Sequence, residues 1–417
     1  MKTLVLGSGG REHAIAWKLA EEIGRESLWI HPGNGGTAAL GFQTLDLEHG
    51  ALVPTAAKET GIELAIIGPE VLLADGLADR LRESGILVVG PGQEGALLES
   101  SKVFSKEFMT RAKIPTAPYR VVESQEELKD LSIPKYPIVL KLDGLAAGKG
   151  VVIAQDAKEV EAFGKRVWKD RAFGTGPHRL LVEENLVGNE LSYIGFCDGE
   201  TFIPMASATD YKRIGENNTG PNTGGMGSIS PSPYLTKKIQ SEIDRQIVEP
   251  FIAQLKSEKI AFRGILFIGV MVTAEGIPFV LEFNTRFGDP ETQAVLMRLE
   301  SSFLEVLTHT AKGTLSACSP LRWSDEQSLY VVAASEGYPT SSKTGDPIEG
   351  IENLPKDVQL FFSGVDRTDD TWVTAGGRVL GLGALAKDRD TVRTKVYDAM
   401  KKINWSGMQY RHDIGAD

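Results

Sequence analysis

The hydrophobic pattern divides the first hundred residues into short apolar runs separated by helical periods. The apolar runs of strand length are residues 3–6, 27–30, 63–68 and 88–89. Between the first two runs, Ile15, Leu19 and Ile23 recur every fourth residue, which is typical of an amphipathic helix. Strands that alternate with helices form a parallel, doubly wound sheet. We therefore expect an N-terminal doubly wound parallel-sheet domain over residues 1–101.

The remaining residues show a mixed pattern of strands and helices. The expected strands are residues 137–141, 179–182, 190–196, 265–272, 279–283, 329–334, 358–362 and 374–381, and helical patterns cover 102–111 and 157–169. Residues 208–228 contain almost no large apolar side chain, which predicts a long polar loop that serves as a lid or binding loop. The pattern therefore predicts an α/β and α+β multidomain protein, with a central domain over 102–319, a lid subdomain at about 117–187 and a small C-terminal domain over 320–417.

Composition and charge exclude several classes of protein. The chain has 417 residues, of which 41% are hydrophobic and 24% charged, as in folded proteins of several domains. The net charge of −11 argues against nucleic acid or an anionic membrane as the main partner. Cys197 and Cys318 are far apart and lack metal-site spacing, and neither a signal peptide nor an 18-residue apolar run is present. We predict a cytoplasmic protein without nucleic-acid or membrane partners.

Glycine-rich turns follow the first strands. The turn Gly7–Gly10 could present backbone N–H groups and a helix N-terminus to an anion. A dinucleotide fingerprint needs a third glycine where this chain has Glu12, so a phosphate or phosphosugar fits better than NAD. The loops 31–37 and 68–75 end neighbouring strands, so we expect all three to line one crevice. His13 and His31 are compatible with ligand contact, with turn capping and with a surface position.

A second glycine-rich loop, residues 143–151, follows the strand that ends in Lys141. It is not a Walker A motif, because three residues rather than four separate Gly144 from Gly148, and Gly150 replaces the Ser or Thr that binds Mg²⁺. A loop that folds over nucleotide phosphates would use the same backbone donors and lysines. Lys141 is expected against a phosphate, whereas Lys102 and Lys149 taken alone also fit solvated surface amines. The hinge from residue 183 to 190 could offer main-chain groups to adenine and a carboxylate to ribose.

The strand at 279–283 ends in an unusual group of polar side chains. Glu282, Asn284 and Arg286 alternate along it, so the period of two places them on one side of the backbone, with Asp289 following. Carboxylate and amide oxygens suit Mg²⁺, which takes few protein ligands and leaves its other positions to water and phosphates. The alternative is an ion pair between Glu282 and Arg286 with Asn284 capping a turn.

Long motifs along the whole chain resemble the phosphoribosylamine–glycine ligase (glycinamide ribonucleotide synthetase) family of ATP-grasp enzymes. These motifs are GSGGREH at 7–13, HPGNGGTA at 31–38, GPE at 68–70, SKVFSK at 101–106, KLDGLAAGKGV at 141–151, DYKR at 210–213, NTGPNTGGMG at 218–227, EFNTRFGDPETQ at 282–293 and TAGGRVLGLGA at 374–384. The chain departs from the family pattern at Thr209, where Gln is usual, and at Asn185, where an aromatic residue is common.

The resemblance implies ATP-dependent ligation of glycine to 5-phosphoribosylamine through a glycyl phosphate, giving glycinamide ribonucleotide, ADP and phosphate in purine biosynthesis. It implies Glu282 and Asn284 as ligands of Mg²⁺ or Mn²⁺, and Arg286, Lys141, Asp210 and Lys212 as catalytic residues. It places Lys102, Lys141, Lys149, Glu184, Leu186 and Glu190 at ATP. It places Gly9, Gly10, Arg11, Glu12, Asn34, Gly35, Gly36, Thr37, Asn222, Thr223, Gly224, Gly225, Met226, Asp289 and Glu291 at the other substrates.

Two other functions fit the same residues. One is an ATP-grasp ligase with a different amine acceptor, because the catalytic half of such enzymes is shared while the first domain selects the acceptor. The other is a nucleotide-binding regulator without catalysis, which Glu282, Asn284, Arg286 and Lys141 argue against. The expected partners are ATP, glycine and 5-phosphoribosylamine, and the expected assembly is a monomer or weak dimer. Transient contact with neighbouring purine-pathway enzymes stays open.

Overall fold

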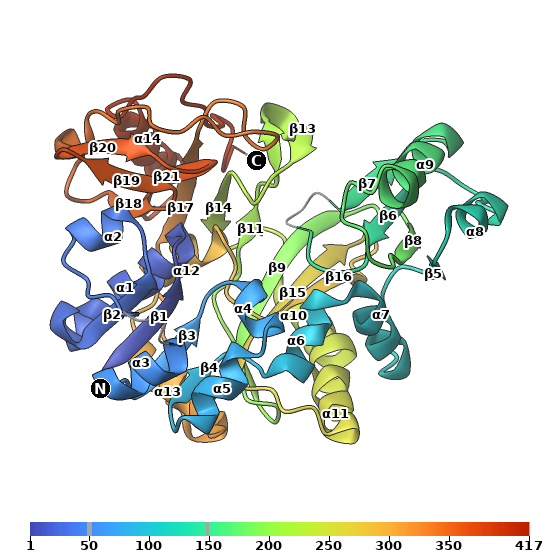
Figure 1. Ribbon diagram of the computed structural model, residues 1–417, viewed down its shortest axis with the longest axis horizontal. Helices are drawn as coiled ribbons and strands as arrows, with labels where there is room; N and C mark the ends of the chain where they lie inside the picture. Colours follow the sequence, from blue (N-terminus) through green and yellow to red (C-terminus); the bar gives the residue numbers. More distant parts are fainter. Residues whose placement is uncertain (48–51, 147–149, 417) are drawn as a thin grey trace.

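The computed structural model describes residues 1–47, 52–146 and 150–416. Its N-terminal part contains a parallel sheet in the order β2-β1-β3-β4 (Figure 1). The strands are β1 (Thr3–Gly7), β2 (Leu28–Pro32), β3 (Leu64–Ile67) and β4 (Leu87–Val89), and the helices are α1 (Gly10–Ile23), α2 (Gly35–Ala39), α3 (Val53–Thr60), α4 (Glu70–Ala74), α5 (Leu77–Glu83) and α6 (Gln93–Ser100). This arrangement confirms the predicted parallel α/β sheet.

The apolar runs form this sheet because helices cover both of its faces. All five residues of β1 are buried, and the strand pairs with β2 on one side and β3 on the other. Ile15 and Leu19 of α1 are fully buried, as their spacing predicts. The turns after β1, β2 and β3 lie together, since Gly33 N–H and Gly68 N–H donate to the carbonyls of Gly7 and Leu6.

The central part contains an antiparallel sheet in the order β10-β9-β15-β16. Its strands are β9 (Asn189–Cys197), β10 (Phe202–Pro204), β15 (Gly264–Val272) and β16 (Pro278–Asn284). Every residue of β15 is buried, and β15 and β16 form the predicted antiparallel hairpin. The accompanying helices are α7 (Lys102–Arg111), α10 (Lys237–Ile243), α11 (Glu249–Glu258), α12 (Glu291–Met297) and α13 (Phe303–Lys312). One apolar core joins this sheet to the N-terminal one, because Val5, Ile194 and Phe303 belong to the same buried cluster.

A second antiparallel sheet, in the order β5-β8-β6-β7, forms a separate lobe that we call the lid lobe. It consists of β5 (Tyr119–Val122), β6 (Ile138–Leu142), β7 (Val151–Ala154) and β8 (Leu180–Glu184), with α8 (Gln125–Asp130) and α9 (Ala157–Gly164). Figure 1 shows this lobe on the right, away from the C-terminal strands. Its own buried cluster includes Leu140, Val160 and Leu180.

The C-terminal sheet has the order β11-β14-β17-β21-β18 and combines residues from two predicted domains. Its strands are β11 (Thr209–Asp210), β14 (Gly227–Ser230), β17 (Gln327–Ala334), β18 (Gln359–Phe362) and β21 (Arg378–Ala386), and α14 (Arg389–Met400) packs on β17 and β21. The hairpin β19 (Val365–Thr368) and β20 (Thr371–Thr374) is separate. No helix in the described part of the chain is long and apolar enough to cross a membrane.

The polar stretch 208–228 is not one continuous loop, so that prediction is wrong in part. Besides β11 and β14, it contains the hairpin of β12 (Arg213–Gly215) and β13 (Thr219–Asn222). The pattern of apolar residues misses these strands because β13 is fully exposed and because β14 pairs with β17, about a hundred residues further along the chain. The central and C-terminal parts are therefore joined by backbone hydrogen bonds across the expected boundary at residue 320.

Candidate active site

The end of β16 carries three polar side chains that are connected to one another. Asn284 Nδ2 lies 3.5 Å from Glu282 Oε1, and Arg286 donates to Asn284 Oδ1 over 3.2 Å. Arg286 also forms ion pairs with Glu99 at 3.1 Å and Glu70 at 3.4 Å. The simple pair between Glu282 and Arg286 does not form in this structure, because the guanidinium is occupied by carboxylates of α4 and α6.

Charge near Glu282 keeps its carboxylate ionised. Burial alone would raise the pKa of Glu282, but the ammonium groups of Lys212, Lys141 and Lys102 together lower it below its ordinary value. For Arg286 burial acts to lower the pKa, and Glu99 and Glu70 outweigh it, so the guanidinium stays charged. The strand end thus presents a half-buried anion with several cations around it, an arrangement suited to a ligand that carries both phosphates and a cation.

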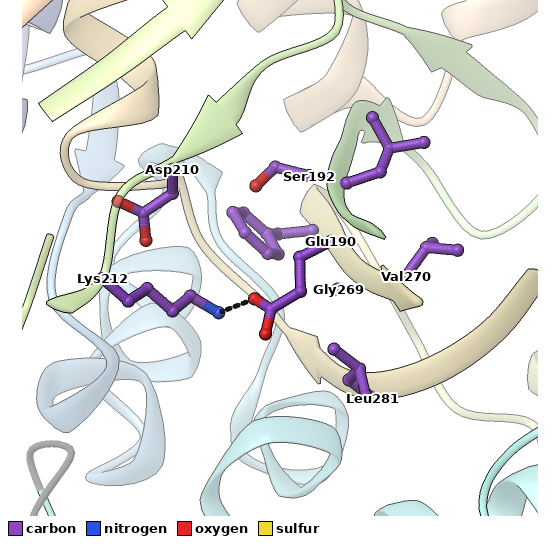
Figure 2. Close-up of a pocket in the computed structure, with 9 residues that line it drawn as sticks. Glu190, Ser192, Asp210, Lys212, Gly269, Val270 and Leu281 are labelled. Atoms are coloured by element: carbon purple, nitrogen blue, oxygen red, sulfur yellow. Dashed lines mark ion pairs between the residues drawn. The ribbon is translucent and has the colours of Figure 1, made fainter. Parts of the chain in front are cut away.

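A small pocket lies beside this strand end, between β9, β15 and the segment after β11. Figure 2 shows Glu190, Ser192, Asp210 and Lys212 around it. Its lining residues are Glu190, Leu191, Ser192, Asp210, Lys212, Phe267, Gly269, Val270 and Leu281. Lys212 Nζ lies 3.3 Å from Glu190 Oε2, and Ser192 donates to Glu291 Oε1 over 3.0 Å. The structure therefore brings residues that the sequence assigned to ATP, to catalysis and to substrate into one place.

Lysines from the lid lobe and from α7 meet beside Leu281 of β16. Lys141 donates to Leu281 O over 3.1 Å and pairs with Glu183 Oε2 at the same distance. Lys106 pairs with that oxygen at 3.2 Å, and burial lowers the pKa of Lys106 to about 8. Sequence reasoning missed both Lys106 and Glu183, although Lys106 stands inside the SKVFSK motif. The cluster joins the lid lobe to β16, because Lys141 of β6 bonds to Leu281 O.

The other described residues predicted at ATP lie in α7 and at or after the end of β8. Lys102 Nζ donates to Gly144 O over 2.8 Å, at the start of the glycine-rich loop. Glu184 is the last residue of β8 and is exposed, and Leu186 follows it half-buried. Lys149 lies outside the residues that the structure describes.

Asp210 is the acid with the most strongly altered environment in this pocket. Its Oδ1 atom is buried and has no hydrogen-bond partner among the described residues. Burial, followed by the nearby Glu291 carboxylate, raises the pKa of Asp210 well above its ordinary value, against the opposing effect of Lys212. Asp210 is therefore a candidate for proton transfer in this pocket.

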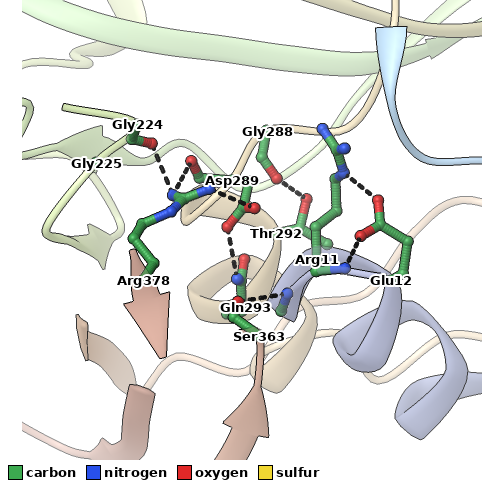
Figure 3. Close-up of polar contacts among 12 residues, drawn as sticks. Arg11, Glu12, Gly224, Gly225, Gly288, Asp289, Thr292, Gln293, Ser363 and Arg378 are labelled. Carbon is green, nitrogen blue, oxygen red and sulfur yellow. Dashed lines mark hydrogen bonds and ion pairs between the residues drawn. The ribbon is translucent and has the colours of Figure 1, made fainter. Parts of the chain in front are cut away.

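In the glycine-rich turn after β1, the backbone donors of Gly9 and Gly10 are occupied. Gly9 N–H donates to Glu12 Oε2 over 2.7 Å, and Gly10 N–H donates to Ser363 Oγ over 2.7 Å. Arg11 donates to Glu12 and to Phe287 O, which joins α1 to the turn after β16. In this structure the turn therefore serves as a junction between the N-terminal helix and both other parts of the chain (Figure 3).

The loop before α2 packs against the C-terminal part. Asn34 caps α2 by accepting from Thr37 N–H, and its amide donates to Ser8 O and Phe362 O. Gly35 and Gly36 leave no room for a larger side chain, because an added Cβ would lie 2.6 Å from the Cα of Asp366 and 2.2 Å from the Phe362 ring. Asn34 and Thr37 thus hold the loop next to the turn after β1.

His13 is neither a turn cap nor a surface residue. Its Nδ1 accepts from Phe362 N–H over 2.9 Å, and its ring stacks on Phe362. Burial, with Arg25 nearby, lowers the pKa of His13 to about 3. His31 is partly exposed and its Nδ1 contacts Thr44 Oγ1, so the two histidines differ completely in environment.

Asp289 lies at a crossing of all three parts, where Arg378 of β21 is a residue that sequence reasoning did not assign. Arg378 bonds to both the carboxylate and the carbonyl of Asp289 and to Gly224 O, while Gln293 donates to the other carboxylate oxygen (Figure 3). Burial would raise the pKa of Asp289, but Arg378 and Arg11 lower it. The only sequence signal for Arg378 was its place in the motif at 374–384.

The predicted substrate loop at 222–226 is held by its own residues and by this crossing. Thr223 donates its backbone N–H and its hydroxyl to Lys212 O, each over 2.8 Å. Gly225 N–H donates to Thr223 Oγ1, and Met226 is fully buried. Asn222 pairs with Arg213 in the β12–β13 hairpin. Because Thr223 fixes the carbonyl of Lys212, the loop and the pocket lysine are connected directly.

Family models match nearly the whole chain. They are the N domain of phosphoribosylglycinamide synthetase over residues 1–99, its ATP-grasp (A) domain over 100–292 and its C domain over 328–417. A solved phosphoribosylamine–glycine ligase from Thermotoga maritima has a TM-score of 0.86 and 33% identity, and the match covers 99% of this chain and 100% of that one. The biotin carboxylase domain of Hydrogenobacter thermophilus 2-oxoglutarate carboxylase, at 17% identity and a TM-score of 0.74 over 98% of this chain and 91% of that one, shares the fold.

Curated relatives agree with the family models. The phosphoribosylamine–glycine ligase of Caldanaerobacter subterraneus is 41% identical over the whole of both chains. That of Vibrio parahaemolyticus is also 41% identical, over 100% of this chain and 98% of its own length. Identity at this level along the full length, together with three consecutive domain models, shows that the chain belongs to the phosphoribosylglycinamide synthetase family.

Proposed function

We propose that this chain is a C–N bond-forming ligase of purine biosynthesis that uses ATP to join glycine to 5-phosphoribosylamine. The products are glycinamide ribonucleotide, ADP and phosphate. The observation that carries the proposal is the polar end of β16, where Glu282 and Asn284 lie near Lys141 of the lid lobe and near Lys102 and Lys212 of other elements. Relatives with the name of this activity match the chain over its full length.

The donor set at β16 fits a hard divalent cation. Glu282 is half-buried and ionised, and Asn284 lies next to it with Nδ2 toward Glu282 and Oδ1 accepting from Arg286. A rotation of the Asn284 amide would bring two oxygen donors of the type that Mg²⁺ or Mn²⁺ prefers side by side. A divalent cation held by Glu282 and Asn284 would supply positive charge to the phosphates of ATP during phosphoryl transfer. Lys102 and Lys141 are placed to bind ATP phosphates once they exchange Gly144 O and Glu183 for the nucleotide.

Glycine must be activated because its carboxylate is a poor electrophile. A carboxylate oxygen attacks the γ-phosphorus of ATP, the bond to the bridging oxygen breaks, and ADP leaves, which gives glycyl phosphate. Arg286, held by Glu70 and Glu99, orients the carboxylate and stabilises the acyl phosphate. The charge on Arg286 is fixed, so it stabilises negative charge without reorganisation.

The amine of phosphoribosylamine then attacks the carbonyl carbon of glycyl phosphate. The new C–N bond forms, phosphate leaves with the electrons of the C–O bond, and the nitrogen releases a proton. Asp210 accepts this proton, since its Oδ1 atom lies in the pocket without a hydrogen-bond partner among the described residues. Lys212, between Asp210 and Glu190, stabilises the departing phosphate. The loops of the N-terminal domain, with Asn34 and Thr37, receive the phosphoribosyl group.

The test is ADP release measured with each substrate omitted in turn. The proposal expects turnover only when ATP, glycine, a divalent cation and phosphoribosylamine are all present. Full turnover without glycine would refute it, and a panel of other amines at fixed ATP and Mg²⁺ tests whether the acceptor is a different one. ATP binding without hydrolysis under any substrate pair would favour a regulator.

Assembly and location are part of the same proposal. We expect a monomer or weak dimer in the cytoplasm, which sedimentation at several protein concentrations and fractionation of cells would test. Mn²⁺ in place of Mg²⁺ is expected to sustain turnover.

A further inference from the structure

The C-terminal segment 409–415 contacts the segment that carries Asp210 and Lys212. Tyr211 lies between these two pocket residues, and its own ring is buried in the C-terminal core with Met226 and Ile414. The side chains on either side of it line the pocket. Because Tyr211 is covalently joined to both neighbours, a displacement of its backbone also displaces Asp210 and Lys212.

Arg411 is the residue that fixes this segment. It is only 1% exposed, and its guanidinium lies 5.2 Å from the centre of the Tyr211 ring. It donates to Arg213 O over 3.1 Å and to Asn218 Oδ1 over 3.0 Å. These contacts hold the chain on both sides of Lys212, at Tyr211 and at Arg213.

Asp413 keeps the guanidinium in this position. Both of its carboxylate oxygens accept from Arg411 over 2.7 Å, and one of them also accepts from Asn217 N–H over 2.8 Å. A bidentate carboxylate with a backbone donor fixes orientation as well as charge. Gly415 N–H donates to the Tyr211 hydroxyl, which adds a second connection from the tail.

We propose that Arg411 is a positioning residue of the active site, which sets the direction of Asp210 and Lys212 by holding Tyr211 and Arg213. The proposal rests on the proposed function, because the roles of Asp210 and Lys212 in acyl transfer define what is being positioned. Arg411 itself contacts no pocket residue, so its effect passes through the backbone. A buried arginine with purely structural value would stabilise the fold without affecting one reaction step.

The experiment compares full-length Arg411→Met and Arg411→Lys with wild type. A displacement of about 1 Å can lower a catalytic rate about 100-fold, so Arg411→Met is expected to lower kcat by that order. The affinity for ADP is expected to stay within about twofold, because Lys102 and Lys141 lie on other elements. Arg411→Lys keeps the charge near Tyr211 and is expected to recover part of kcat.

Arg82→Met is the matched control. Arg82 lies in α5, its side chain is 26% exposed, and it donates to two backbone carbonyls, those of Val88 and Gly90. It is expected to lower the melting temperature while kcat stays near wild type. If Arg82→Met lowers kcat as much as Arg411→Met at equal loss of stability, or if Arg411→Met keeps wild-type kcat, the positioning role is refuted.

Hydrogen exchange separates this proposal from the proposed function. Peptides covering residues 209–224 are expected to exchange faster in Arg411→Met and not in Arg82→Met, whatever the substrates are. Unchanged exchange there would overturn the proposal. Wild-type protein without glycine-dependent turnover would instead refute the proposed function.

Discussion

Two carboxylates seven positions apart, Glu282 and Asp289, have opposite environments. Asp289 has both oxygens bonded, one to Gln293 and the other to Arg378. Among the residues that the structure describes, Glu282 accepts one long hydrogen bond, from Asn284 at 3.5 Å. Both acids are ionised, but the charge of Asp289 is matched within the fold and that of Glu282 is matched by more distant lysines. Asp289 therefore joins the central and C-terminal parts of the chain, whereas the few contacts of Glu282 support the proposal that it binds a ligand.

The largest expected effect on kcat comes from removing the Glu282 carboxylate. Glu282→Gln is expected to lower kcat at least about 10³-fold, because it removes an anionic oxygen that holds the catalytic cation. The melting temperature should change little, since the fold does not use this charge. Steady-state ADP release and calorimetry measure the two effects. Glu275→Gln, on the exposed turn of the same hairpin, is the matched control, and near-normal turnover in Glu282→Gln would discard the metal assignment.

Removing the Asp289 carboxylate is expected to lower stability more than activity. Asp289→Asn leaves the charge of Arg378 poorly matched and is expected to cost about 3 kcal/mol of stability, with less effect on kcat than Glu282→Gln. Calorimetric unfolding measures the loss. The double variant Asp289→Asn with Arg378→Met should recover part of that stability, because no buried charge is then left alone. A loss of kcat in Asp289→Asn as large as that in Glu282→Gln would contradict the different roles of the two carboxylates.

The packed junction that contains Asp289 extends along α1 to His13. The folded protein binds a proton there only near pH 3, whereas the unfolded chain binds it near pH 6.5. Stability is therefore present above pH 6.5 and is lost as the pH falls, by up to about 1.4 kcal/mol per unit. In His13→Asn the free energy of unfolding should depend less on pH between 6.5 and 5. The contribution of His13 to this dependence is about 2 kcal/mol at pH 5. An unaltered pH dependence in His13→Asn would contradict the burial argument.

The smallest expected effect concerns the hydroxyl that caps α1 from the C-terminal part. Ser363→Ala removes the acceptor of Gly10 N–H and is expected to cost about 1 kcal/mol, with Ser363→Thr restoring most of it. Thermal unfolding measures this cost. The KM for phosphoribosylamine is expected to stay within about twofold. A large rise in KM without loss of stability would show that this end of the junction serves the ligand directly.

Local sequence patterns predicted the elements that depend on near neighbours. The parallel N-terminal sheet, the β15–β16 hairpin and the alternation of Glu282, Asn284 and Arg286 follow from periods of two and four, which a few consecutive residues define. Motif resemblance added the family, and hence the reaction, which periodicity alone does not contain.

The parts that the sequence missed depend on distant partners. His13 is buried because Phe361 and Phe362 surround it, and nothing near residue 13 encodes their arrival. Arg378 and Asp289 lie 89 positions apart, and β14 finds β17 across a similar separation. Glu183 forms ion pairs with two lysines from different elements. In each case a pairing across the fold decides the role, and local composition looks ordinary.

The C-terminal sheet, which combines strands from two distant segments, limits how the chain can be cut or recombined. Gly227 to Ser230 pair with residues 328–331, so excision after residue 319 would leave β14 with an open edge available to other chains. Residues 209–230 and 327–417 therefore form one structural unit that is discontinuous in sequence. Exchange of this unit between relatives should succeed only when both segments are transferred together.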